Sequence, residues 1–199
     1  MSKFENHGPI SFVISCGTVR VTDPCYDATT ECAGTISKVL NGQWKGFTIK
    51  SDEGDWGKRV AALFVHHESW IGRVPTTVEE IENDMEMTEF DIGVDSGQAG
   101  IFDADEFNRQ ALHIDHSNND ESNKHNAFYS LACEVNNGPE GAGSVGFGIN
   151  SCSGYGDGGY DCYHLTNDGG EVEAIAIVFI PTEEDQEDKF GDEYPDTLT

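Results

Sequence analysis

Short runs of apolar and β-branched residues, separated by turn residues, recur along most of the chain. Ile10–Ser15 and Thr18–Thr22 flank a Cys-Gly pair and predict the two strands of a hairpin. The Asn-Gly pair at 41–42 predicts a second hairpin between Ile36–Leu40 and Trp44–Lys50, because both residues tolerate the positive φ angles of a two-residue turn.

Other segments complete a mainly β pattern. Further strands are predicted at Arg59–His66, Phe90–Val94, Ala99–Phe102, Ala127–Val135, Ser144–Asn150 and Glu171–Ile180. Thr77 and Glu80 form a capping box at the start of a helix that extends to Met87. Asp103 is placed to cap a second short helix that ends near Leu112.

About ten short strands with frequent turn signals favour an antiparallel sandwich or a strongly bent sheet, with one or two short helices, over βαβ units. We expect one domain over residues 1–181 and a flexible acidic tail over 182–199, where acidic residues crowd and apolar ones are scarce. No internal repeat is convincing, although the segments around Asp95 and Asp157 invite comparison.

The charge of the chain limits the classes of partner that it can bind. It has 37 acidic and 11 basic residues, for a formal net charge of −26. Such a field repels phosphates and anionic lipids, so no direct nucleic-acid or membrane partner is expected. A small molecule, a basic protein surface or a divalent cation remains. Since the first residues lack the apolar stretch of a secretory signal, we expect a cytoplasmic protein.

The six cysteines, at positions 16, 25, 32, 133, 152 and 162, contain no C-x-x-C pair and match no zinc motif. Free, mostly buried thiols are the simplest interpretation in a chain without an export signal. In an oxidising compartment the alternatives are disulfides such as Cys25–Cys32 or Cys152–Cys162. Cys152 is also a weak candidate nucleophile, with one of the histidines as its base.

The segment "VDSGQAGIFD" has the local pattern of an aspartic-protease loop, in which two such loops bring carboxylates together. One copy would require a homodimer. The simpler interpretation is a turn between two strands in which Asp95 accepts backbone hydrogen bonds and Ser96 sits at the corner.

The segment "SGYGDGGYDCY" surrounds Asp157 with four glycines, which lets the backbone approach a ligand closely. It lacks the lysine of a phosphate-binding P-loop. A bulged hairpin, with Tyr155 and Tyr160 packed over the glycines, is the alternative.

No cofactor is expected, apart from a possible divalent cation. The carboxylates near the second glycine-rich segment suit calcium: Asp157, Asp161 and Asp168, with Asn167 beside them. Their spacing does not match an EF-hand loop. For a transition metal the weak candidates are His113 and His116 in "HIDH".

Taken together, "GTVRVTDPCY", "WGKRVAALFVHH", "GVDSGQAGIFD" and "SGYGDGGYDCY" resemble a family of uncharacterised bacterial and phage proteins defined as a domain of unknown function. The resemblance spans Gly17 to Phe179 and implies a β-rich domain without an established activity. A phage origin would place the protein in the host cytoplasm. The positions that the resemblance singles out are Asp23, Pro24, Asp95, Ser96, Gly97, Gly100, Asp103, Gly154, Gly156, Asp157, Gly158 and Tyr160.

Three functional hypotheses follow. The first is a non-enzymatic binding module whose ligand pocket lies where the turns around Asp23, Asp95 and Asp157 converge, with Ser96 and Tyr160 as further ligand-binding candidates. The second is an Asp-dependent hydrolase, either metal-assisted or similar to an aspartic protease. The third is an acidic decoy that binds a basic host protein.

Overall fold

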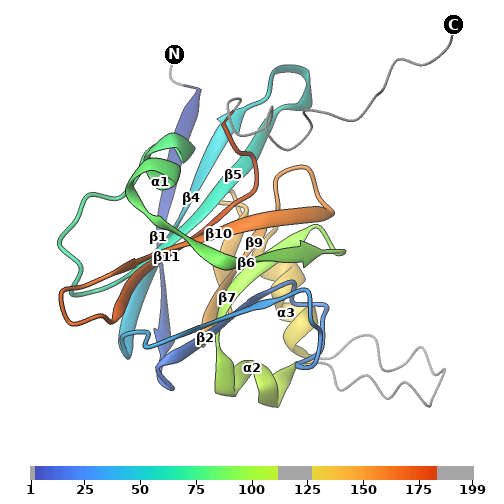
Figure 1. Ribbon diagram of the computed structural model, residues 1–199. Coiled ribbons are helices and arrows are strands. Elements are labelled where there is room, and N and C mark those ends of the chain that lie inside the picture. Colours follow the sequence, from blue (N-terminus) through green and yellow to red (C-terminus); the bar gives the residue numbers. More distant parts are fainter. Residues whose placement is uncertain (1–2, 112–126, 183–199) are drawn as a thin grey trace, which may run out of the picture.

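The computed structural model describes residues 3–111 and 127–182, which form two antiparallel sheets packed face to face (Figure 1). Sheet A has, in spatial order, β1 (Phe4–Ile14), β4 (Gly42–Asp52), β5 (Lys58–His67), β11 (Val172–Val178), β10 (Gly158–Thr166) and β6 (Glu86–Val94). Sheet B has β3 (Gly34–Ser37), β2 (Thr18–Thr22), β7 (Gln98–Asp103), β9 (Gly148–Cys152) and β8 (Ala142–Ser144). The predicted mainly β sandwich is confirmed.

Short helices cover the outer faces of the sandwich. The helix α1 (Val78–Asp84) packs Val78 and Ile81 against the outer face of sheet A. The helices α2 (Ala104–Gln110) and α3 (Ala127–Val135) lie against sheet B (Figure 1), where Phe102, Phe107 and Phe128 form a second apolar core. A 3₁₀ turn, η1 (Gly54–Trp56), joins β4 to β5. None of the helices within residues 3–111 and 127–182 has the length and apolar character that crossing a bilayer requires.

The predicted helix starts are confirmed, with one difference in detail. The Thr77 hydroxyl accepts the Glu80 N–H at 3.3 Å, but the Glu80 carboxylate binds the N–H of Thr76 rather than that of Thr77. Asp103 caps α2 as predicted. The strand predicted at 127–135 is wrong: Phe128 and Ala132 are spaced for one face of a helix, and α3 buries both.

The chain changes sheets at four places: residues 15–17, 38–41, 95–97 and 153–157. Both predicted hairpins are therefore wrong, since β1 and β3 lie in a different sheet from the strands that follow them. At the Asn-Gly pair, the Asn41 side chain accepts the Gly17 N–H at 2.7 Å, so it ties one crossing segment to another instead of closing a two-residue turn.

The two halves of the sandwich share one topology. Matching β1 to β6, β2 to β7, β3 to β9, β4 to β10 and β5 to β11 reverses the strand order of sheet A, and that of sheet B except for the additional β8. A pseudo-two-fold axis therefore passes between β5 and β11 in one sheet and between β2 and β7 in the other. The halves differ most in one connection, which spans 23–33 in the first half and 104–147 in the second.

The registers of the matched strands agree as well. Ile14 pairs with Gly42 where β1 meets β4, and Val94 pairs with Gly158 where β6 meets β10. Both second strands thus begin with a glycine. The irregularity in the β4–β5 pairing after Ile49 also recurs between β10 and β11 at the matching position.

Two aromatic side chains repeat the correspondence. The indole N–H of Trp44 donates to the carbonyl oxygen four residues earlier at 2.9 Å, and the Tyr160 hydroxyl donates to the equivalent carbonyl at 2.6 Å. Trp44 meets the ring of His67 edge-on at 5.8 Å, as Tyr160 meets Phe179 at 5.2 Å. The expectation that the chain has no internal repeat is therefore wrong at the level of the fold. Few side chains are shared, which is why the sequence hides it.

Residues at the ends of the paired central strands of sheet B hold two of the four sheet crossings, those before β2 and β7. The residue before β2, Gly17, and the residue before β7, Gly97, have φ angles of 69° and 70°, a left-handed conformation that favours glycine. Asp103, the last residue of β7, binds the crossing that precedes β2. Asp23, the residue after β2, binds the crossing that precedes β7.

Asp103 shows the arrangement in the first half of the chain. One carboxylate oxygen accepts the N–H groups of Ser15 and Cys16, at 2.7 and 3.1 Å, and the Ser15 hydroxyl at 2.9 Å. The other oxygen accepts the N–H groups of Asp105 and Glu106, both at 3.1 Å, and so caps α2. Burial opposes ionisation of Asp103, but these hydrogen bonds outweigh it and lower the pKa of the carboxyl group.

The Asp103→Asn substitution should lower the free energy of unfolding by about 2–4 kcal/mol, because the amide leaves buried N–H donors without an anionic acceptor. A depressed pKa contributes stability that is present above pH about 4 and is lost as the pH falls through the native pKa. Urea unfolding from neutral to acidic pH should show this loss in full in the wild type and reduced in Asp103→Asn, in which other carboxyl groups with lowered pKa values, such as Glu53 and Glu80, remain. Asp105→Asn, an exposed carboxylate on the same helix, should keep it. An acid profile unchanged by Asp103→Asn would show that the carboxylate does not hold the crossing.

Candidate functional site

The segments around Asp23 and Asp95 meet at the second clamped crossing. Asp23 is fully buried, and one of its oxygens accepts the N–H groups of Asp95 and Ser96, at 2.9 and 2.8 Å. The other oxygen accepts the Ser96 hydroxyl at 2.7 Å and the Cys25 N–H at 2.8 Å. Four donors thus occupy the acceptor positions of one carboxylate.

The second glycine-rich loop lies against the same turn. The Ser153 N–H donates to the Gly97 carbonyl at 3.1 Å, and a Cβ placed on Gly97 would lie 3.7 Å from the Cα of Gly156. The Tyr160 hydroxyl lies within hydrogen-bond distance of the carbonyls of Ser153 and Gly156, so it supports the loop from inside. Three segments far apart in sequence therefore meet at one corner of the sandwich, called the Asp95 corner below.

The candidate residues occupy different positions at this corner. Asp95 is exposed and Ser96 is half-buried, so both reach the surface. Asp23 and Tyr160 are buried and bind backbone groups. Asp157 is exposed, and among the described hydrogen bonds its side chain makes none that joins the three segments.

Two tyrosines complete the Asp95 corner. Burial raises the pKa of Tyr26, and hydrogen bonding to the Asp95 carboxylate raises it further. Burial and hydrogen bonding to the Cys133 thiol raise the pKa of Tyr129 to about 12, and this hydroxyl also interacts with Ser96. Both phenols therefore stay protonated at neutral pH and can donate hydrogen bonds.

A polar network links the corner to α3. The Gln98 side-chain oxygen accepts the amide groups of Asn136 and Asn150, each at 2.8 Å, and its nitrogen donates to the Cys133 sulfur at 3.3 Å. The network fixes the side of α3 that presents Tyr129. Gln98 thus positions this side of the corner through α3.

The pseudo-two-fold separates shared features from local ones. Asp23 corresponds to Asp103, and Tyr160 corresponds to Trp44, so both belong to the frame that the two halves share. Asp95 and Ser96 match Ser15 and Cys16, which lack a carboxylate. Tyr26 and Tyr129 come from the connections in which the halves differ, 23–33 and 104–147.

Sequence reasoning missed both tyrosines. Tyr26 ends the quoted "TDPCY" stretch, so its closeness to Asp23 was a usable signal. Tyr129 carried none, because α3 was predicted to be a strand and only its packing on sheet B brings it to Ser96.

The proposed calcium ligands do not converge. Asp157 precedes β10, Asp161 lies within it and Asp168 follows its end, so the three carboxylates spread along the whole strand. In the part of the chain that the structure describes, no group of three or more His, Cys, Asp or Glu side chains is placed to hold a metal ion. His113 and His116 lie outside the described residues.

All six cysteines are free thiols, including the four considered for disulfides. Burial raises the pKa of Cys25, and the neighbouring Asp23 carboxylate raises it further. Burial likewise raises the pKa of Cys152, the candidate nucleophile. Both sulfurs are therefore held in the poorly nucleophilic thiol form.

Comparison with known proteins gives one match. No curated protein and no solved structure matches the chain. A family model described as "Protein of unknown function (DUF4241)" matches residues 12–177, which contain both crossings held by Asp23 and Asp103, all of sheet B, and sheet A except most of β1 and the last residue of β11. The resemblance inferred from the motifs is thereby confirmed at the level of a family of unknown function. The chain belongs to the DUF4241 family.

Proposed function

We propose that the protein is a non-enzymatic binding module that takes a small polar molecule at the Asp95 corner. The observation that carries the proposal is the gathering of Tyr26, Asp95, Ser96 and Tyr129 around a turn whose backbone is held by a buried carboxylate. Binding sites of this kind place a few polar groups on rigid supports at loop ends.

The chemistry of the corner favours a ligand rich in hydrogen-bond donors. Asp95 offers an exposed carboxylate, while the phenol oxygens of Tyr26 and Tyr129, whose protons are bound to Asp95 and Cys133, can each accept a hydrogen bond. The negative field of a chain with net charge −26 disfavours an anion. A neutral or cationic polar molecule suits both the acceptor groups at the corner and the negative charge of the chain.

The same geometry supports binding over hydrolysis. An aspartic protease needs two carboxylates that share a proton, whereas Asp23 binds the backbone beneath Asp95 and the Asp95 side chain turns to Tyr26. Ser96 donates its hydroxyl proton to a carboxylate that already accepts three N–H groups, so that carboxylate is poorly placed to act as a base.

A thermal-shift screen of neutral and cationic polar small molecules on the full chain tests the proposal. A compound that binds the corner should lose about tenfold in affinity with Asp95→Asn and with Tyr26→Phe, because each change removes about one hydrogen bond to the ligand. Asp105→Asn, the loss of an exposed carboxylate beside the other clamp, should leave its affinity unchanged. A screen without a saturable hit, or hits insensitive to both corner variants, would refute the proposal.

A second measurement separates an organising role for Asp23 from a catalytic one. Asp23→Asn should lower the free energy of unfolding by about 2–4 kcal/mol, and Ser96→Ala by about 1 kcal/mol, because they remove buried hydrogen bonds. Asp95→Asn should change it by less than about 0.5 kcal/mol, since its carboxylate is exposed. Urea unfolding at neutral pH measures all three. An Asp23→Asn protein as stable as the wild type would instead favour a reserved catalytic carboxylate.

A further inference from the structure

The second glycine-rich loop, Ser153–Gly158, is called the SGYGDG loop below. A groove on another side of this loop has no part in the Asp95 corner. Its cavity volume is about 580 Å³, within the range of small-molecule sites. It lies between the start of β1, the end of β4, the first turn of α1 and the loop that carries Tyr155. Its walls combine aromatic and apolar side chains with Lys3, Glu53 and Glu79.

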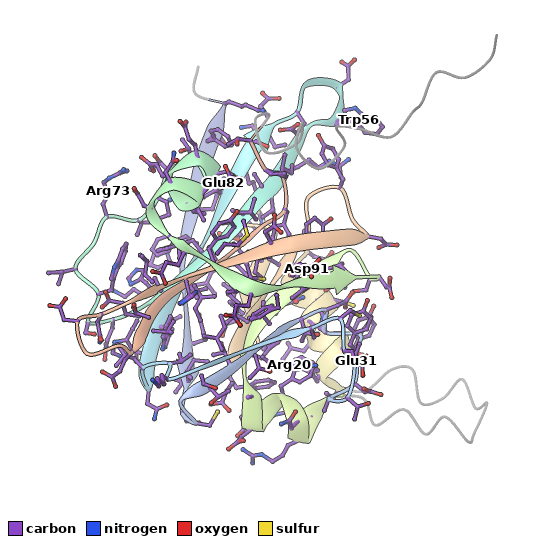
Figure 2. The ribbon with its side chains drawn as sticks, in the orientation of Figure 1. Arg20, Glu31, Trp56, Arg73, Glu82 and Asp91 are labelled. Atoms are coloured by element: carbon purple, nitrogen blue, oxygen red, sulfur yellow. The ribbon has the colours of Figure 1, made fainter. Side chains whose placement is uncertain are left out.

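Two exposed aromatic rings lie in contact beside this groove: Tyr155, which lines it, and Trp56, which packs on the Tyr155 ring. Trp56, at the tip of the β4–β5 hairpin, is 70% exposed, and Tyr155 is 54% exposed. Figure 2 shows Trp56 directed away from the sandwich. The rings meet edge-on with centroids 6.4 Å apart. A single exposed aromatic residue needs no explanation, but two in contact beside a cavity mark a surface suited to binding.

The rim is held in place by hydrogen bonds. The Tyr155 hydroxyl donates to one oxygen of Glu53 at 2.6 Å, and the Ser51 hydroxyl donates to the other at 2.5 Å. These two bonds lower the pKa of Glu53, which stays ionised. The carboxylate thereby fixes the tyrosine ring next to Trp56, although the two aromatic residues are far apart in sequence.

The chain's own cations already contact several of the groups near this groove that would attract a cationic ligand. Arg59 lies 5.7 Å from the centre of the Tyr155 ring, and Lys3 lies 5.8 Å from that of Phe4. Lys3 also lies 3.7 Å from the Glu53 carboxylate. Lys3 and the nearby Arg59 thus accompany the two carboxylates that line the groove, Glu53 and Glu79, in a chain with net charge −26. A cation would have to displace these contacts, whereas a neutral ligand would not.

We propose that the groove between Trp56, Tyr155 and Lys3 is a second binding site, for a neutral saccharide. A pyranose ring presents C–H groups on its flat faces and hydroxyls around its edge. The exposed indole of Trp56 suits the face, and Glu79 and Lys3 supply an acceptor and a donor for the hydroxyls. The site is independent of the Asp95 corner, with which it shares only the SGYGDG loop.

Tryptophan fluorescence with neutral disaccharides tests the site, using maltose, cellobiose and diacetylchitobiose on the full chain. At least one should cause a saturable change in emission at millimolar concentration. Trp56→Ala should abolish this response, and Tyr155→Phe, which frees the ring from Glu53, should weaken binding about tenfold. Saturation-transfer NMR on the same variants reports binding without relying on the indole.

Matched controls make the outcome decisive. Trp70→Phe removes a tryptophan beside a different hollow, next to α1, and should leave the response intact. Tyr26→Phe should also leave it intact, which separates this site from the Asp95 corner. Because Trp56 is exposed, its variant should keep the wild-type melting temperature. The proposal is overturned if no neutral disaccharide binds, if Trp56→Ala still binds, or if only a cationic peptide such as oligolysine gives a saturable response.

Discussion

Two buried carboxylates hold two of the four places where the chain passes between the sheets, the segments before β2 and β7, and the arrangement of both halves depends on them. A crossing segment leaves backbone N–H groups without partners in either sheet, and an unpaired N–H group costs free energy even where the segment is only partly buried. Asp103 and Asp23 accept those N–H groups, and each also accepts an N–H two residues after itself. Each aspartate side chain thus binds backbone N–H groups both in the crossing before the neighbouring strand and in the segment that follows its own strand.

The exchange of clamps between β2 and β7 ties the two halves of the chain to each other. Each half contains the aspartate that the other half needs, and β5 pairs with β11 at the centre of the second sheet. The sandwich therefore has internal two-fold symmetry, with its two halves joined by strand pairing in both sheets. Residues that recur in both halves, such as Asp23 and Asp103, stabilise the common frame. Residues found in only one half, such as Tyr26 and Tyr129, are not needed for that frame and can contact a ligand.

On that basis the Asp95 corner and the Trp56 groove are the asymmetric parts of the molecule. Tyr26 comes from the shorter version of one connection, and Tyr129 from the longer. Trp56 projects from the β4–β5 hairpin, whose counterpart, the turn after β10, carries Asn167 and Asp168 instead. The SGYGDG loop lies between the two sites and presents a different side chain or backbone group to each.

The sequence by itself determined the β class, most strand positions and both helix caps, because alternation, capping residues and glycine turns are local signals. The meeting of the segments around Asp23, Asp95 and Asp157 was only a hypothesis at that level, because the hydrogen bonds that join them are tertiary. It did not reveal that adjacent strands belong to different sheets. Asn41-Gly42 has the same local preference in a hairpin and in a crossing, and only the partner of its side chain, Gly17, decides between them. The internal repeat was hidden for a related reason, since the two halves, which meet where β2 pairs with β7, share a backbone arrangement but very few side chains. The tyrosines at the Asp95 corner and the rings at the groove were likewise decided by tertiary packing, which joins residues that no sequence spacing relates.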